Sequence, residues 1–124
     1  MVGAYDRKRG TAIIDTPQGI LVVRQGQARF LLPGGGVKNS ESRLEAAVRE
    51  LREETGLIAY EVRFLCEYHQ SKVFLMKTNG IPHPKHEISQ IGYYTRDSTL
   101  PISYNTKAII ENYWTMKMEK KKEV

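Results

Sequence analysis

Residues 35–57 read GGVKNSESRLEAAVRELREETGL, a glycine-rich turn followed by a helical pattern that carries three closely spaced glutamates. Ser42 and Glu45 stand three residues apart, which is the capping-box pattern at the start of a helix. Apolar residues then recur at helical spacing until Gly56, which is a residue suited to a C-terminal cap. The pattern predicts a helix from about residue 43 to residue 55.

Glu50, Glu53 and Glu54 share one face of this predicted helix, beside its apolar stripe. Like charges three or four residues apart repel one another by a few tenths of a kcal/mol per pair, so a carboxylate stripe without interleaved lysines calls for a cation. Carboxylate oxygens suit Mg²⁺ or Mn²⁺, which commonly bind together with substrate phosphates. No Cys or His joins the stripe, and this disfavours softer metals.

The spacing of this stretch resembles the Nudix box, the signature of the Nudix hydrolases. The matching positions are Gly35, Glu41, Arg49-Glu50-Leu51, Glu53-Glu54 and Gly56-Leu57. The segment FLLPGG at residues 30–35 is similar to the family's entry into the box. The resemblance implies an α/β fold, the Nudix-type α/β/α sandwich, in which a mixed β-sheet lies with the Nudix helix and a C-terminal helix.

The resemblance also implies an activity, the hydrolysis of a diphosphate linked to another moiety, with water attacking phosphorus under the control of Mg²⁺ or Mn²⁺. It assigns metal binding to Glu50, Glu53, Glu54 and the main-chain carbonyl of Gly34, and it assigns the orientation of that cluster to Arg49 and Glu41. Bridging metals neutralise phosphate oxygens and lower the pKa of a bound water. Either Glu53 or Glu54 is expected to be the general base, and the two are not separated.

Candidate site residues also lie outside the carboxylate stripe. Glu87 precedes Tyr93 by six residues, the place where many Nudix enzymes add an acidic ligand or base; a solvated loop carboxylate is an equal alternative. Arg24 ends a predicted strand where the family often has a substrate-contacting arginine, with Arg29 nearby. The expected substrate-binding residues are Arg24, Arg29, Gly35 and Gly36.

The remaining elements follow from β-branched runs and turn residues. Strands are expected at residues 11–15 and 20–24, as a hairpin, and at 28–32, 60–68, 72–77 and 88–95, with a flexible glycine loop after Pro33, a loop at 79–85 and a helix at 105–117. A chain of 124 residues is one domain's worth of sequence, so residues 1–124 are expected to form a single Nudix domain.

The composition of the chain argues against several other classes of protein. The chain is 40% hydrophobic and 27% charged, without an apolar run of the roughly 20 residues that span a bilayer, so no membrane role is expected. A polar N-terminus and the lone Cys66 indicate the cytoplasm. The net charge of +5 is densest at the two ends, at residues 7–9 and 117–122, and is interpreted as solvated termini. Nucleic acid is therefore not the expected partner, while a homodimer is compatible with the resemblance.

The substrate is expected to be a small nucleotide or another diphosphate compound, by default a nucleoside triphosphate or nucleotide derivative. The markers of the ADP-ribose and diadenosine-polyphosphate branches, a proline and a tyrosine, are missing where residues 72–75 stand. The alternatives are a non-catalytic nucleotide-sensing or RNA-binding Nudix module, and an RNA-end pyrophosphohydrolase. An isopentenyl-diphosphate isomerase is disfavoured, because Cys66 lies in no matching motif.

Overall fold

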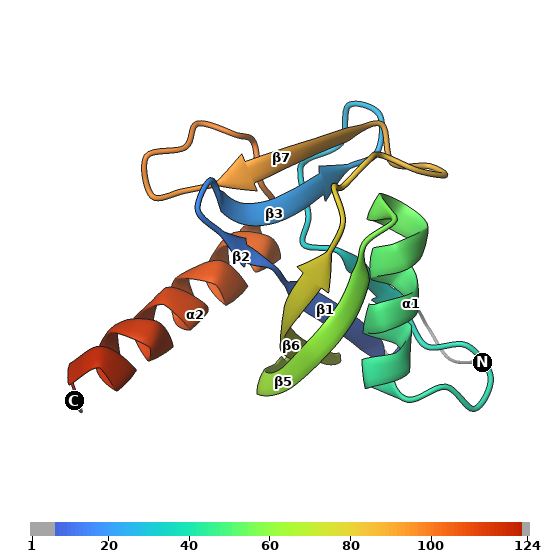
Figure 1. Ribbon diagram of the computed structural model, residues 1–124, viewed down its shortest axis with the longest axis horizontal. Helices are drawn as coiled ribbons and strands as arrows, with labels where there is room; N and C mark the ends of the chain where they lie inside the picture. Colours follow the sequence, from blue (N-terminus) through green and yellow to red (C-terminus); the bar gives the residue numbers. More distant parts are fainter. Residues whose placement is uncertain (1–6, 123–124) are drawn as a thin grey trace.

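The computed structural model describes residues 7–122 (Figure 1). Its elements are β1 (Arg9–Ile13), β2 (Asp15–Thr16), β3 (Gly19–Arg24), β4 (Gly34–Gly36), α1 (Arg43–Thr55), β5 (Ile58–Tyr68), β6 (Ser71–Asn79), β7 (Gln90–Tyr94) and α2 (Tyr104–Lys122). A mixed α/β fold with two helices is thereby confirmed, and the predicted bounds of α1 agree with those of the structure.

The strands form two sheets. The larger one has the order β4-β1-β6-β5, and it is mixed because β1 runs parallel to β6 while the other neighbours are antiparallel. The smaller one, β2-β3-β7, is antiparallel throughout. In Figure 1, α1 and α2 lie on opposite sides of the large sheet.

Side-chain alternation along the strands explains this sandwich, since successive residues point to opposite faces of a sheet. Ile13 and Val73 belong to a core that also contains residues of α2, whereas the neighbouring Ala12 and Phe74 belong to a second core beside α1. Each core buries mainly aliphatic side chains, and each fixes one helix against the central strands. The two cores thereby set the position of α1 relative to β1 and β4.

Both ends of α1 are held as the sequence predicts. Ser42 Oγ accepts the Glu45 amide at 3.0 Å, and the Glu45 carboxylate accepts the Ser42 amide at 2.9 Å. Gly56 ends the helix in the left-handed conformation, at φ 79°. The helix packs so closely on β1 that a Cβ atom at Gly10 would collide with the backbone of Ala47. This close packing directs the outer face of the helix toward β4.

The expectation of a flexible loop after Pro33 is wrong, because residues 34–36 form β4 and pair with β1. Glycine is usually unfavourable in a strand, but here it allows backbone and carboxylate to approach closely. A Cβ atom at Gly34 would meet the Gly10 carbonyl, and one at Gly35 would meet the Glu50 carboxylate. The glycines therefore form an edge strand that lies directly against the glutamate helix.

Two other strand predictions need correction. The expected hairpin is present only at its tip, where Asp15 pairs with Ile20, because residues 9–13 pair with β4 and β6 instead of β3. Residues 28–32 form no regular strand; Phe30 and Leu31 make isolated bridges to Ile102 and Val23. No helix within residues 7–122 is long and apolar enough to span a membrane.

Candidate active site

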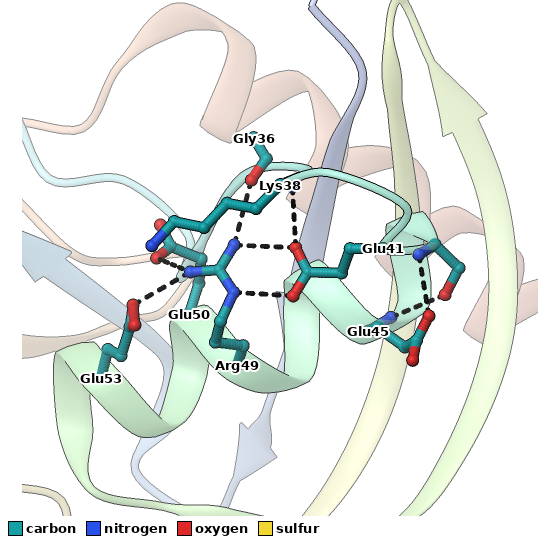
Figure 2. Close-up of polar contacts among 8 residues, drawn as sticks. Gly36, Lys38, Glu41, Glu45, Arg49, Glu50 and Glu53 are labelled. Atoms are coloured by element: carbon teal, nitrogen blue, oxygen red, sulfur yellow. Dashed lines mark hydrogen bonds and ion pairs between the residues drawn. The ribbon is translucent and has the colours of Figure 1, made fainter.

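Arg49 is the centre of the polar network on the outer face of α1 (Figure 2). Its Nε and Nη2 donate to the two carboxylate oxygens of Glu41 at 2.7 and 3.0 Å. Its Nη1 donates to Glu50 at 2.9 Å and to Glu53 at 3.0 Å, and Nη2 also donates to the Gly36 carbonyl at 3.1 Å. One guanidinium thus joins the loop before α1, the glutamate stripe and β4.

This network controls the ionisation of the carboxyl groups around Arg49. The hydrogen bond from Arg49 lowers the pKa of Glu41 to about 2, so Glu41 is ionised at any physiological pH. Burial raises the pKa of Glu50, whereas the hydrogen bond with Glu50 lowers the pKa of Glu53. The negative charge of Glu53 therefore disfavours ionisation of Glu50. A cation bound near both carboxyl groups would favour the ionised form of each.

Glu54 is the buried member of the stripe, with only 7% of its surface exposed. Its carboxylate accepts the Gly34 amide at 3.2 Å, and it forms no ion pair among residues 7–122. Burial raises the pKa of Glu54 to about 8, and the charges of Glu50 and Glu87 add to that rise. A buried carboxylate without a counter-ion is a feature that a bound metal cation would compensate.

The segment between β6 and β7 is attached to the end of α1, where the last carbonyls of a helix lack partners within the helix. The amide of Lys85 donates to the Glu54 carbonyl at 3.1 Å, and the amide of His83 donates to the Thr55 carbonyl at 2.9 Å. These bonds hold the segment so that Glu87 lies in the same cavity wall as Glu54. The placement is consistent with the role that the sequence suggested for Glu87, which stays a prediction.

A cavity of about 300 Å³ opens beside these groups and is called the first cavity. The charged groups in its wall are Glu50, Glu54 and Glu87 together with Arg7, Arg9, Lys38 and Arg49, and the glycines 34–36 of β4 complete the side facing α1. Carboxylates that attract a divalent cation and basic groups that attract phosphate oxygens therefore share one small space. Phosphate bound through a metal needs both kinds of group.

The donor set fits a hard divalent cation, because every candidate ligand is an oxygen. Glu50 and Glu54 are in the cavity wall, and Glu53 is next to Glu50 on the same helical face. Within the described part of the chain, no three Asp, Glu, His or Cys side chains are already arranged around one metal position. Arg49 holds Glu50 and Glu53, and the Gly34 amide holds Glu54.

The arginines expected to contact substrate lie elsewhere. Arg24 donates from Nε to the Ala28 carbonyl at 2.8 Å, and Arg29 donates to the Ile102 carbonyl at 3.5 Å. Neither residue is in the wall of the first cavity. Both substrate-binding assignments therefore lack structural support, while Gly35 and Gly36 do line the cavity as expected.

Arg7 and Arg9 also line the first cavity. The sequence did not indicate this, because a basic run before a strand is typical of a solvated terminus. Arg9 pairs with Gly36 across β1 and β4, and this pairing places it beside the box glycines. The guanidinium of Arg7 occupies the space where a Cβ atom of Gly36 would lie. The sequence holds no local signal for either contact, since both depend on the pairing of strands about 25 residues apart.

The arrangement has counterparts among known proteins. The family model of the NUDIX domain matches residues 5–114. A Chromobacterium violaceum protein described as a nudix hydrolase family member is 32% identical, with a TM-score of 0.83 over 94% of this chain and 81% of that chain. No curated protein sequence matches the chain.

Two further solved structures share the fold. A MutT NUDIX hydrolase from Burkholderia pseudomallei is 24% identical, with a TM-score of 0.74 over 85% of this chain and 95% of that one. An ADP-ribose pyrophosphatase from Streptococcus suis is also 24% identical, with a TM-score of 0.67 over 82% of each chain. At this level of identity the likeness concerns the fold alone.

Proposed function

The chain belongs to the Nudix family and is a pyrophosphohydrolase, and from this premise we propose that it uses Mg²⁺ to hydrolyse a pyrophosphate bond in a nucleoside diphosphate linked to another moiety. A nucleoside triphosphate or a nucleotide derivative is the proposed substrate. The observation that carries the proposal is Glu54, a buried carboxylate that forms no ion pair within residues 7–122, in a wall that it shares with several basic side chains.

In this proposal the metal is held by Glu50, Glu53, Glu54 and the Gly34 carbonyl, with Glu87 as a ligand or base from the neighbouring segment. The bound metal supplies charge neutralisation at the phosphates and an acidified water. The chain's own groups do the rest: Arg49 and Glu41 keep the carboxylates in place, and Glu53 or Glu54 takes the proton from the attacking water. Arg9 and Lys38, which are in the wall of the first cavity, would bind the phosphate oxygens.

The solved structures that share the fold include proteins described by a nucleotide substrate. Two of them are described as a MutT hydrolase and an ADP-ribose pyrophosphatase, and a third as a UDP-X diphosphatase. The last two descriptions name compounds in which a diphosphate group is joined to a nucleoside. The common chemistry is therefore the phosphoric anhydride, and it is the part of the substrate that the glutamate helix would recognise.

A hydrolysis screen tests this function. Purified protein is incubated with Mg²⁺ and nucleoside triphosphates, sugar nucleotides, dinucleoside polyphosphates or capped RNA, and phosphate and nucleotide products are measured. We expect Glu53→Gln and Glu54→Gln each to lower kcat by at least about a hundredfold on any substrate that the wild type cleaves. Full activity of both variants would contradict the assignment, and so would a wild type that cleaves none of the compounds.

Glu61→Gln is the matched control for these two variants. The Glu61 side chain is 63% exposed on β5 and forms an ion pair with Lys77 at 3.5 Å. The substitution removes one carboxylate charge from the same protein without touching the cavity. We expect wild-type rates from this variant.

The metal requirement is tested separately. Replacing Mg²⁺ by Mn²⁺ should preserve turnover, because oxygen ligands accept either metal, and EDTA should abolish turnover.

A further inference from the structure

β5 is the outer strand of the large sheet, at the end opposite β4 (Figure 1). It pairs with β6 along one edge, and within residues 7–122 no backbone group of residues 58–68 is paired along the other edge. An unpaired edge is a template on which another strand can pair. β5 has 11 residues, about twice the usual length of a strand, so this open edge is long.

Large apolar side chains are exposed along β5. Ile58, Tyr60 and Phe64 have 52%, 60% and 53% of their surface exposed. Phe64 also borders a groove of about 390 Å³ together with the exposed Leu44, between the start of α1 and the strands β5 and β6. Exposed apolar side chains gathered on one surface mark sites of contact with another protein.

Only the middle of β5 is regular. Glu61 to Phe64 pair with β6 without a shift in register, and shifts occur on both sides, at Tyr60 and Leu65. Bulges on an edge strand restrict further pairing, because they bend the strand and interrupt its row of hydrogen-bonding groups. A second strand would therefore pair mainly along the short regular stretch, which is suited to a weak and reversible contact.

Symmetry limits how β5 can pair with the β5 strand of a second copy. Opposite residues of an antiparallel pair point to the same face, and successive residues alternate between faces, so a two-fold axis must pass through one residue. An axis at Glu61 or at Arg63 would place two like charges directly opposite each other, which is unfavourable. An axis at Phe64 would pair Arg63 with the irregular Leu65. Val62 is the remaining position in the regular stretch.

An axis at Val62 places complementary side chains opposite one another. Glu61 lies opposite Arg63 of the second copy, Tyr60 lies opposite its Phe64, and the symmetry repeats both pairs. Opposite charges and aromatic rings are favourable cross-strand pairs. Arg63 is exposed and forms no ion pair within residues 7–122. The ion pair of Glu61 with Lys77 is exposed and 3.5 Å long, so Glu61 is also accessible to a second copy.

We propose that two copies of the chain associate through antiparallel pairing of their β5 strands about a two-fold axis at Val62. Their four-stranded sheets then join into one continuous sheet. β4 and the glutamate helix face of the first cavity lie toward the far end of each sheet, so both cavities stay open. The inference goes beyond the proposed function and does not depend on it.

Charge reversal tests the pairing, with analytical ultracentrifugation as the measurement. Wild type is studied at concentrations up to about 1 mM, where even a weak dimer is populated. Arg63→Glu places acidic side chains opposite each other, and Glu61→Arg places basic side chains opposite each other. Each single variant should raise the Kd of the dimer at least about tenfold. The double variant restores opposite charges and should dimerise as the wild type does.

A mixture of the two single variants identifies the register. One variant then contributes two acidic side chains and the other two basic ones, so heterodimers should form where neither variant dimerises alone. Glu67→Arg is the matched control, because Glu67 is 52% exposed on the same strand and lies outside the paired residues; it should dimerise as the wild type does. A monomeric wild type, a dimer that tolerates both single reversals, or a mixture without heterodimers would overturn the inference.

Discussion

Arg49 and Glu41 face each other through two parallel hydrogen bonds, from Nε to Oε2 at 2.7 Å and from Nη2 to Oε1 at 3.0 Å. The side chains are only 20% and 16% exposed, so the pair is well shielded from water. Glu41 belongs to the loop before α1, whereas Arg49 is two turns into the helix. Bidentate pairing fixes the plane of the guanidinium, and its remaining N–H groups are therefore aimed at Glu50 and Glu53.

Replacing Glu41 by Gln should reduce catalysis without removing any metal ligand. The amide retains one acceptor oxygen, so Arg49 loses one of its two bonds and its negative partner. We expect kcat/KM to fall about 10- to 100-fold, the usual effect of groups that orient metal ligands. The Mg²⁺ concentration for half-maximal activity should rise as well. An unchanged Mg²⁺ dependence would contradict a positioning role, and Arg49→Lys, which lacks the planar fork, should reproduce both effects.

Gly35→Ala should disable the site by crowding alone. A Cβ atom at Gly35 would overlap the Glu50 carboxylate, so Glu50 must leave its present position. We expect loss of most activity, about a hundredfold or more, because a displacement of about 1 Å at a catalytic group has effects of this size. Gly26→Ala is the control: φ is 51° there and nothing lies within 4 Å of the added atom. It should cost roughly 1 kcal/mol of stability and no activity.

The metal-free protein should lose stability as the pH rises, because of Glu54. The pKa of Glu54 is raised to about 8 in the folded protein, against an ordinary value of 4.5. Below pH 4.5 the folded and unfolded chains are both protonated at Glu54. Between pH 4.5 and 8 only the unfolded chain releases the proton, so folding becomes less favourable, by about 3–5 kcal/mol in all, and the loss levels off above pH 8.

Urea unfolding in EDTA at pH 5 and pH 9 measures this effect. Glu54→Gln should flatten the dependence of unfolding free energy on pH, and Glu61→Gln should retain the wild-type dependence. Mg²⁺ should stabilise the wild type most at pH 9, where Glu54 is ionised, and should stabilise Glu54→Gln much less. An identical pH dependence in wild type and Glu54→Gln would show that Glu54 is not the group whose raised pKa makes stability depend on pH.

Local patterns in the sequence were sufficient for α1 and its network. The capping residues, the apolar spacing and the glutamate stripe all lie within 15 residues of one another, and the structure realises each of them. The positions that a helix brings together follow from its pitch, so Arg49 could be expected near both Glu50 and Glu53. The family resemblance assigned Glu41 a positioning role together with Arg49. The structure shows two hydrogen bonds between these residues, and the role itself stays a prediction.

Local patterns in the sequence could not predict the contacts between distant segments. Arg9 reaches the first cavity because β1 pairs with β4, and the glycines of β4 give no periodic strand signal. Arg24 was selected by its place at the end of a strand, but its guanidinium is used by the Ala28 carbonyl and by Gln90. Which arginine faces a cavity depends on strand register, and register is set by the assembled core rather than by any one segment.

Tyr113→Phe should weaken the attachment of α2 while leaving catalysis intact. The Tyr113 hydroxyl donates to Asp15 Oδ2 at 2.6 Å, and Lys117 donates to the same oxygen at 2.8 Å, so this helix is tied to the start of the β2–β3 hairpin. Tyr113 is 6% exposed, and burial raises its pKa well above the ordinary range, so the hydroxyl stays protonated as a donor. Losing one such bond to a charged acceptor should cost about 1.5–3 kcal/mol of unfolding free energy.

Thermal unfolding measures this cost. KM and kcat should stay within about twofold of wild type, because Tyr113 is not in the wall of the first cavity. A stability equal to wild type would mean that the Lys117 ion pair alone secures Asp15, which a Lys117→Met variant on the Tyr113→Phe background would then expose as a larger combined loss.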